Sequence, residues 1–360
     1  MIPMNQPFLP PENEYLTLVR SALKRNWLTN DGPLLNELEL KLKHRFNLNH
    51  AIVVSNGTIA LQIAIKALGL KGKVLTTPFS YIATASSLAW EGCTPVFVDI
   101  AHDHFNVTPE ALESQLTEDV TGIVLTHCFG FPLDVVAIDA LAAKAGIPVI
   151  YDGAHAFGST VNGQSIFAFG DISTCSFHAT KIFHMVEGGG IFAKDPDTLK
   201  KSSWMRNFGH NGPGVYAGIG INGKNSEMHA AMGLANLNHI DPVLSRRRQQ
   251  CAHYNNLLSE EDSILLPDLN TPGWNCAYYP VVFESSQITE IIQTTLQQHE
   301  VFPRRYFWPS LNQVNGWGGE CPNSEDISQR VLCLPLYHGL DSESQQYVAR
   351  LILRTLRYRR

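Results

Sequence analysis

The sequence predicts an α/β protein with a mainly parallel, seven-stranded sheet and a smaller C-terminal α/β domain. Between residues 50 and 195, short runs rich in β-branched residues alternate with amphipathic helical stretches. This alternation is typical of a parallel sheet that helices cover on both faces. The 360-residue length suits one large domain with a smaller one, and 44% hydrophobic residues with 17% charged residues are usual for a globular protein.

Strands in the first half are expected, in chain order, at residues 53–55, 74–77, 95–99, 122–126, 147–152, 173–177 and 189–193. Helical stretches follow the first two strands and run to about Leu68 and Trp90, and another covers residues 134–145. Ligands of such sheets collect beyond the carboxyl ends of the strands. We therefore expect the functional residues at those ends.

The second half predicts one long helix over residues 226–254, broken or bent near Asp241-Pro242. A strand at 278–283, a helix at 288–299, a strand at 331–336 and an amphipathic helix from Ser342 follow it. We expect a large domain over residues 1–240, which includes a substrate-side segment at 1–35, and a small domain over 241–360. The basic end of the last helix is expected to be a solvated face.

Charge and cysteine content exclude several classes of protein. A net charge of −6 argues against a nucleic-acid partner, and no stretch reaches the roughly 18 apolar residues of a membrane span. The N-terminus lacks the features of a secretory signal. Seven scattered cysteines form no C-x-x-C pair, so we expect buried free thiols in a cytoplasmic protein.

Two apparent ligand motifs are weak. Gly218–Gly223 matches the dinucleotide-binding fingerprint, but no apolar strand precedes it. His102-Asp103-His104 has no third ligand at a suitable spacing. We expect neither a dinucleotide site nor a metal site.

Lys181 is the most informative residue of the chain. It lies between a predicted strand and the glycine-rich turn 187–190, and Asp152 ends the preceding strand, with His155 close behind. A lysine at this place can condense with an aldehyde, and a carboxylate at a strand end can keep a pyridine nitrogen protonated. This combination predicts pyridoxal 5'-phosphate (PLP) as the cofactor.

Two further features are compatible with PLP but weak alone. Gly57 and Thr58 lie where a strand turns into a helix, which suits a phosphate, although a simple helix cap would look the same. Tyr81 offers a flat face for the cofactor ring, and packing in the core is the alternative.

Taken jointly, the motifs resemble the DegT/DnrJ/StrS family of PLP-dependent nucleotide-sugar aminotransferases over essentially the whole chain. The segments that carry the resemblance are residues 6–8, 26–33, 55–58, 78–84, 152–155, 176–190, 220–231, 303–306 and 334–336. Residues 176–190 are the most specific of them. The resemblance implies an aspartate-aminotransferase-like fold (fold type I) and a homodimer whose active site is shared across the interface.

The resemblance also implies a role for each cofactor residue. Lys181 would form the Schiff base, Asp152 would pair with the pyridine nitrogen, and His155 would lie beside the phenolic oxygen. Tyr81 would stack on the ring. The phosphate would be held by Gly57, Thr58 and Ser176, and by Asn222 of the other subunit.

Four residues are expected to contact the substrate: Thr29, Glu187, Arg305 and Tyr306. The chain departs from the family pattern at Gly153, where alanine is usual, and at Lys224, which replaces an arginine. The second departure leaves the partner of that residue open.

The implied reaction has two halves. A donor, expected to be glutamate, converts PLP to pyridoxamine phosphate, which then aminates a nucleotide-linked keto-sugar. The opening Gln6-Pro7-Phe8 and residues 177–184 look most like enzymes that aminate dTDP-4-keto-6-deoxy-D-glucose at C4 for O-antigen synthesis.

Four alternatives stay open at this point. Amination at C3 of a dTDP-3-keto sugar and amination of a UDP-4-keto sugar would use nearly every one of these motifs. Related sugar dehydratases carry histidine where this chain has Lys181, which argues against dehydration. A non-catalytic nucleotide-binding homologue would have no need to retain Lys181 and Asp152.

Overall fold

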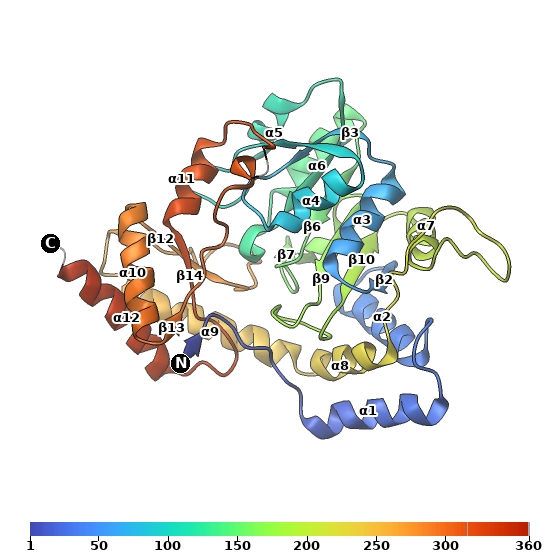
Figure 1. Ribbon diagram of the computed structural model, residues 1–360, viewed down its shortest axis with the longest axis horizontal. Helices are drawn as coiled ribbons and strands as arrows, with labels where there is room; N and C mark the ends of the chain where they lie inside the picture. The colour runs from blue at the N-terminus through green and yellow to red at the C-terminus, as the bar shows by residue number, and fades with distance from the viewer. Residues whose placement is uncertain (315, 359–360) are drawn as a thin grey trace.

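The computed structural model describes residues 1–314 and 316–358. Its centre is the predicted seven-stranded sheet, in the order β2-β10-β9-β6-β5-β3-β4 (Figure 1). The strands are β2 (Ala51–Val54), β3 (Gly72–Thr76), β4 (Cys93–Phe97), β5 (Val120–Thr126), β6 (Val149–Asp152), β9 (Ile172–Ser176) and β10 (Gly189–Ala193). Every pairing is parallel except those of β10, which runs antiparallel to β2 and β9. The prediction of a mainly parallel sheet is confirmed.

Helices cover both faces of this sheet (Figure 1). They are α2 (Pro33–Phe46), α3 (Gly57–Leu68), α4 (Ile82–Trp90), α5 (Pro109–Gln115), α6 (Val135–Ala145), α7 (Pro196–Arg206) and α8 (Glu227–Leu237). Along β6, Ile150 belongs to one core cluster and Tyr151 to the other, and Val124 and Leu125 of β5 divide in the same way. Because successive side chains of a strand point to opposite faces, two apolar layers form from one sheet.

Local sequence signals set the ends of α3, the helix that follows β2. The Asn56 side chain accepts a hydrogen bond from the Ile59 amide at 2.8 Å and caps the first turn. Gly69 ends the helix with a φ of 70°, a conformation that costs glycine little. The first turn of α3 is therefore held in place directly after β2, at the edge where the strands end.

The C-terminal part contains a three-stranded antiparallel sheet in the order β11-β12-β14. Its elements are α9 (Ile240–Leu258), β11 (Ile264–Leu265), β12 (Tyr279–Phe283), α10 (Ser286–Gln298), α11 (Pro322–Arg330), β14 (Val331–Leu334) and α12 (Ser342–Arg357). Short elements also occur: the hairpin β7 (Thr160–Val161) and β8 (Gln164–Ser165), and the 3-10 turns η1 (Cys128–Gly130), η2 (Ile166–Ala168) and η3 (Leu311–Gln313).

The helix predicted over residues 226–254 is broken, which was one of the two predicted possibilities. It forms α8 and α9, which are separated at Asn238 and His239, shortly before the predicted position. Pro242 lies in the first turn of α9, where its missing amide hydrogen has no helical partner to lose. The first turn of α9 therefore accommodates the proline without a bend. The domain boundary at residue 240 stays a prediction.

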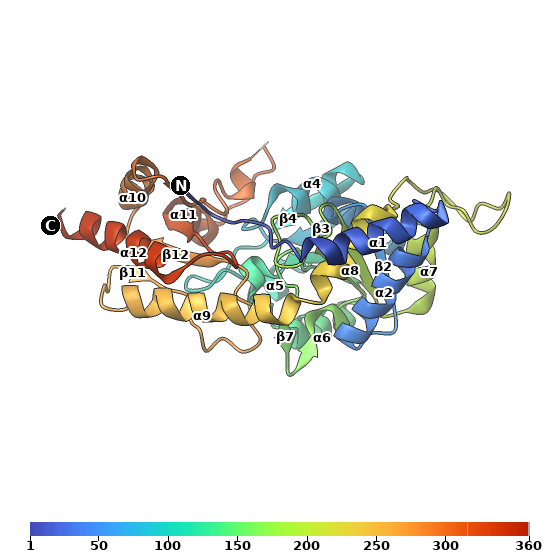
Figure 2. The same cartoon turned by 90° about the horizontal axis from the view of Figure 1, so that it is seen from below.

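The N-terminus lies beside the C-terminal elements. β1 (Ile2–Pro3) pairs in parallel with β13 (Val301–Phe302), and the Leu336 amide donates to the Met4 carbonyl at 2.9 Å. The chain then crosses to α1 (Glu12–Arg25), which packs against α8 (Figures 1 and 2). The first residues therefore bridge the C-terminal part of the fold and the sheet. Local sequence pattern gave no sign of this pairing.

All seven cysteines are free and buried, as predicted. Across the described residues, none of the helices combines the length and the apolar character that a bilayer crossing requires.

The contact between α2 and α8 yields a test of core packing. Leu38 is fully buried, and a Cβ added at Gly233 would lie 2.8 Å from its Cδ2 atom. We expect Gly233→Ala to lower the free energy of unfolding by about 1–3 kcal/mol through overpacking. Leu38→Ala should cost about 2–5 kcal/mol. In the double variant the alanine methyl fills part of the space that Leu38 leaves. The double variant should therefore lose less unfolding free energy than the sum of the losses in the two single variants.

Thermal unfolding of the two single variants and the double variant measures this coupling. The intrinsic helix preference of alanine over glycine cancels in the cycle, because it is the same in both backgrounds. Additive losses would show that the two positions do not compete for space.

Candidate functional site

The carboxyl ends of the sheet strands surround a cavity of about 790 Å³. The predicted residues that line it are Gly57, Thr58, Tyr81, Asp152, His155, Ser176, Lys181, Glu187 and Tyr306. They come from β6, β9, the start of α3 and loops that are far apart in the sequence. The fold thus brings together most of the residues that the motifs singled out.

Asp152 is buried at the end of β6 and is held by short hydrogen bonds. Its carboxylate accepts the Thr84 hydroxyl at 2.8 Å and the Ala154 amide at 3.0 Å. Burial raises the pKa of Asp152, and the bonds from Thr84 and Ala154 and the charge of Lys181 oppose that rise. A buried carboxylate held in this way is suited to a cationic ligand group.

A chain of hydroxyl groups fixes the orientation of that carboxylate. Ser80 Oγ lies 2.8 Å from both Thr84 Oγ1 and Thr126 Oγ1. Thr126 ends β5, next to β6 in the sheet, so the support comes from the neighbouring strand end. Thr84 and Thr126 line the cavity as well. Their part was not predicted, since isolated threonines carry no recognisable spacing.

Lys181 is half-buried in the loop between β9 and β10. Burial lowers its pKa below the ordinary value, while Tyr306 and Asp152 oppose that shift. The neutral amine is therefore populated at lower pH than that of a solvated lysine. A neutral amine is the form that attacks an aldehyde and accepts a proton.

His155 offers an unsatisfied polar atom to the cavity. Its ring stacks on Phe307 with 5.6 Å between centroids, and Nδ1 has no hydrogen-bond partner among the described residues. Burial, assisted by Lys181, lowers the pKa of His155 well below its usual value. The imidazole is thus neutral and can make one more hydrogen bond.

The start of α3 forms a cradle for an anion. A Cβ at Gly57 would lie 2.9 Å from the Ser176 Cβ, and one at Gly189 would lie 2.4 Å from the Asn56 carbonyl oxygen. Glycine at both places lets β10 and β9 approach the first turn of the helix. Unpaired amides at a helix N-terminus attract phosphate.

These observations fit PLP. The cradle at Gly57, Thr58 and Ser176 suits the phosphate, Asp152 suits a protonated pyridine nitrogen, and Lys181 suits the aldehyde. The unsatisfied Nδ1 of His155 is available to a further cofactor or substrate atom. Tyr81 is 58% exposed at the cavity wall, so its ring face is accessible for stacking on the cofactor ring.

Thr29 and Asn222 lie outside this cavity. Both line a second one of about 650 Å³, which shares Ser55 and Glu187 with the first. Asn222 Oδ1 accepts the Lys224 amine at 2.9 Å, and that amine lies 4.4 Å from the Phe208 ring centroid. The partner of Lys224, which the sequence left open, is thus identified within the chain. The role of Asn222 across an interface stays a prediction.

Arg305 also lies outside the cavity. Its guanidinium donates to the Gln329 carbonyl at 2.7 Å and lies 4.5 Å from the Trp308 ring. The cavity wall contains Arg304 instead. Neighbouring residues of an extended segment point in opposite directions, and the backbone of Arg304 is bridged to Cys333. The segment therefore presents Arg304 to the cavity, and a substrate contact by Arg305 stays a prediction.

The two histidines that flank Lys181 have different positions. His178 lines the cavity, and its Nε2 lies 3.5 Å from Glu187 Oε1. His184 is buried away from the cavity and donates from Nε2 to the Phe8 carbonyl at 2.6 Å. Asn5 donates to the Thr180 carbonyl at 2.8 Å. The N-terminal segment is therefore fastened on both sides of the lysine.

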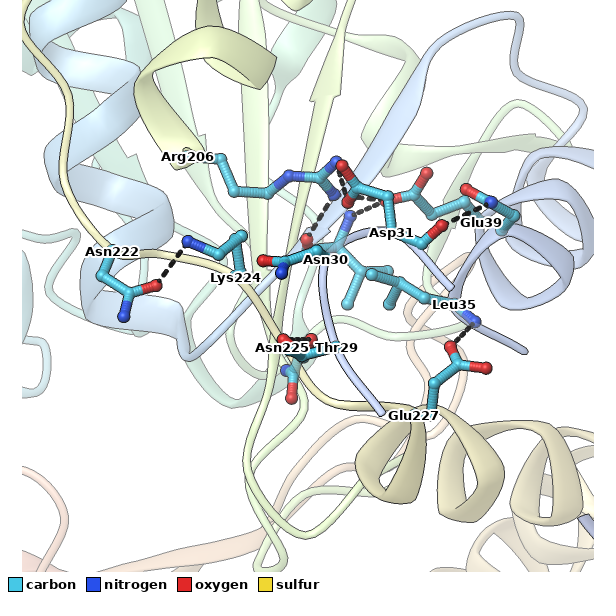
Figure 3. A network of polar contacts seen from close by, with 12 residues as sticks. Thr29, Asn30, Asp31, Leu35, Glu39, Arg206, Asn222, Lys224, Asn225 and Glu227 are labelled. Carbon is cyan, nitrogen blue, oxygen red and sulfur yellow. Dashed lines mark hydrogen bonds and ion pairs between the residues drawn. The ribbon is translucent and has the colours of Figure 1, made fainter. Parts of the chain in front are cut away.

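A buried arginine holds the segment that carries Thr29 (Figure 3). Arg206 donates to Glu39 Oε1 at 2.6 Å, to the Val53 carbonyl at 2.9 Å and to Asp31 Oδ1 at 2.8 Å. Burial raises the pKa of Glu39, and Arg206 opposes this rise most strongly. The network joins α2, β2 and the end of α7 beside the second cavity.

Comparison with known proteins agrees with this geometry. Residues 11–353 match the model of the DegT/DnrJ/EryC1/StrS aminotransferase family. The chain is 37% identical to a dTDP-4-amino-4,6-dideoxy-D-glucose transaminase of Shigella dysenteriae, with 96% of each chain covered. It is 33% identical to an Escherichia coli protein of the same name, with 98% of each covered.

A solved structure of DesI in the presence of its TDP-sugar product superimposes with a TM-score of 0.94 at 30% identity. The match covers 98% of this chain and 93% of that one. Similarity at this level extends over both the central sheet and the C-terminal elements.

Removal of Arg206 should destabilise the fold, because it leaves the buried Glu39 carboxylate without its cationic partner. We expect Arg206→Ala to lower stability by about 3–5 kcal/mol at neutral pH. Without the guanidinium, the folded-state pKa of Glu39 rises further above its unfolded value. The penalty is therefore absent below the unfolded pKa and grows as pH rises. Melting temperatures at pH 5 and pH 8 should show the larger deficit at pH 8.

Glu39→Gln in the Arg206→Ala background is the control. It removes the carboxylate, so it should recover part of the loss at pH 8 and little at pH 5. An equal deficit at both pH values would contradict the assigned role of Glu39.

The lowered pKa of Lys181 predicts the pH dependence of cofactor capture. The rate at which the apoprotein takes up PLP should rise with pH as the amine loses its proton. The midpoint should lie below 10.5, the ordinary lysine value. Stopped-flow absorbance at a series of pH values measures it. A midpoint at or above that value would show that the folded protein does not favour the neutral amine.

Proposed function

The chain belongs to the DegT/DnrJ/EryC1/StrS aminotransferase family, and from this premise we propose that its substrate is dTDP-4-keto-6-deoxy-D-glucose. The enzyme is a PLP-dependent aminotransferase of nucleotide sugars. In the proposed reaction an amino group passes from L-glutamate to C4, which gives dTDP-4-amino-4,6-dideoxy-D-glucose.

One observation carries the choice of sugar. Two relatives named as dTDP-4-amino-4,6-dideoxy-D-glucose transaminases match the chain along nearly its whole length, at 37% and 33% identity. The cavity beside Lys181 supplies the chemical requirements of the same reaction.

Each residue of the site has a task in this reaction. PLP, when bound, supplies an electron sink that acidifies the Cα–H bond of the donor. Asp152 would hold the ring nitrogen, and the bonds from Thr84 and Ala154 favour the ionised form of its carboxylate against the effect of burial. Gly57, Thr58 and Ser176 would hold the phosphate.

Lys181 would carry the proton. Burial lowers the pKa of its amine and so favours the neutral form. In the first half-reaction this amine would take the proton from the donor Cα and pass it to the cofactor, and in the second half-reaction it would transfer a proton in the opposite direction, to the sugar carbon. Tyr81 and the His155–Phe307 stack would limit the movement of the ring. Glu187 and Tyr306, at the cavity wall, would face the sugar.

We further propose a homodimer in the cytoplasm in which Asn222 of one subunit reaches the cofactor phosphate of the other. Asn222 lines the second cavity, next to the shared wall at Ser55 and Glu187. The amino sugar would be used in O-antigen or other surface polysaccharide synthesis.

Assays of the purified holoenzyme test the proposal. With glutamate as donor, we expect amination of dTDP-4-keto-6-deoxyglucose at a kcat/KM at least tenfold above that for the 3-keto isomer or a UDP-4-keto sugar. Product position is determined by NMR. Lys181→Ala should abolish turnover and the visible absorbance that arises from the cofactor–lysine bond.

Lys144→Ala is a matched control, because the Lys144 side chain is 80% exposed and pairs only with Glu113 in the described structure. It should leave both signals unchanged. Preference for one of the other sugars would replace the proposed substrate, and full turnover by Lys181→Ala would refute the role of the lysine.

A further inference from the structure

Two adjacent arginines of the segment after β13 have opposite environments. Arg305 is tied to the C-terminal elements by the Gln329 carbonyl, the Trp308 ring and Glu290, which lies 3.9 Å away. Arg304 is exposed and lines the cofactor cavity. Within residues 1–314 and 316–358, no hydrogen bond or ion pair engages its guanidinium. An arginine that is free of structural partners at a cavity wall is available to a ligand.

Arg304 lies on the same wall as the reacting amine. Its charge and that of Lys181 both lower the pKa of Tyr306, against the effect of burial. Its charge also lowers the pKa of Tyr278, another cavity residue, which burial raises. Arg304 and Lys181 therefore both lie near Tyr306 in the wall of one cavity.

The cavity needs a permanent positive charge. Lys181 must be neutral for its chemistry, and His155 is neutral because burial lowers its pKa. His178 forms an ion pair with Glu187 only when it is protonated. Asp152 and Glu187 add negative charge. Of the described residues that line the cavity, Arg304 alone stays positively charged throughout the reaction.

We propose that Arg304 binds the α-carboxylate of the amino donor. This carboxylate is one bond from the carbon that must lie next to Lys181, whereas the diphosphate of the sugar substrate is separated from the reacting C4 by the pyranose ring. A planar guanidinium matches a carboxylate with two parallel hydrogen bonds. The inference rests on the proposed aminotransferase reaction but not on the identity of the sugar.

Separate measurement of the two half-reactions distinguishes binding of the donor α-carboxylate from binding of the sugar diphosphate. Stopped-flow absorbance of the holoenzyme with glutamate reports the donor half, and the pyridoxamine form with the keto-sugar reports the acceptor half. In Arg304→Ala the apparent Kd for glutamate should rise roughly 10- to 100-fold. The Kd for the keto-sugar should change less than about threefold, and Arg304→Lys should recover part of the loss.

Substrate truncation supplies an independent readout. 4-Aminobutyrate lacks the α-carboxylate, so the ratio of its kcat/KM to that of glutamate should rise in Arg304→Ala, because the variant removes a contact that only glutamate makes. Arg305→Ala is the matched control, since this neighbouring guanidinium does not line the cavity; its Kd for glutamate should stay within about threefold of wild type. The cofactor absorbance of each variant verifies that the site is intact.

An unchanged glutamate Kd in Arg304→Ala would overturn the proposal, and a rise in the keto-sugar Kd alone would indicate that Arg304 binds the diphosphate. An equal rise in the Kd of both substrates would also overturn it, because it would indicate a nonspecific electrostatic effect of the positive charge. An unaltered preference for glutamate over 4-aminobutyrate would do the same. If the wild-type enzyme shows no spectral change with any amino acid, the proposed function itself fails. The two failures are therefore distinguishable.

Discussion

The buried carboxylate of Asp152 is the constraint on which the rest of the site depends. Its burial at the end of β6 would favour the protonated acid, and the bonds from Thr84 and Ala154 oppose that tendency. Thr84 is in turn held by Ser80, which also contacts Thr126 at the end of β5. Because the strands are parallel and in register, the ends of β5 and β6 supply both the acid and its support from one edge. This edge fixes where a cationic ring can bind.

The C-terminal part closes the other side of that site. Phe307 stacks on His155, and Tyr278, Arg304 and Tyr306 complete the cavity wall. The N-terminal residues join this part to the lysine loop, through β1 at one end and the bonds of Asn5 and Phe8 at the other. The position of Lys181 therefore depends on three separated regions of the chain. Such an arrangement explains why the N-terminal motif belongs to the functional site although it has no reactive group.

The comparison of Arg304 with Arg305 shows where motif reading reaches its limit. The motif correctly indicated that this segment lies at the pocket, since Tyr306 lines it. The direction of each side chain was decided by the backbone bridge to Cys333, about thirty residues further along the chain. In the same way, the predicted break between α8 and α9 falls at Asn238 and His239, and Pro242 lies in the first turn of α9. The direction of a side chain and the exact position of a helix end are geometry that neighbouring residues do not determine.

Periodic apolar runs and short motifs determined the sheet, most of its helices, the family and most of the predicted residues that line the cavity beside Lys181. These properties depend on local patterning, whose period sets each element, and on residues such as Lys181 and Asp152 whose chemistry is specific. Tertiary structure alone decided the hydroxyl chain behind Asp152, the Arg206 network, the pairing of β1 with β13 and the arginine that faces the cavity. Each of these joins residues that are distant in the chain, and their contacts arise only after the strands and helices have packed.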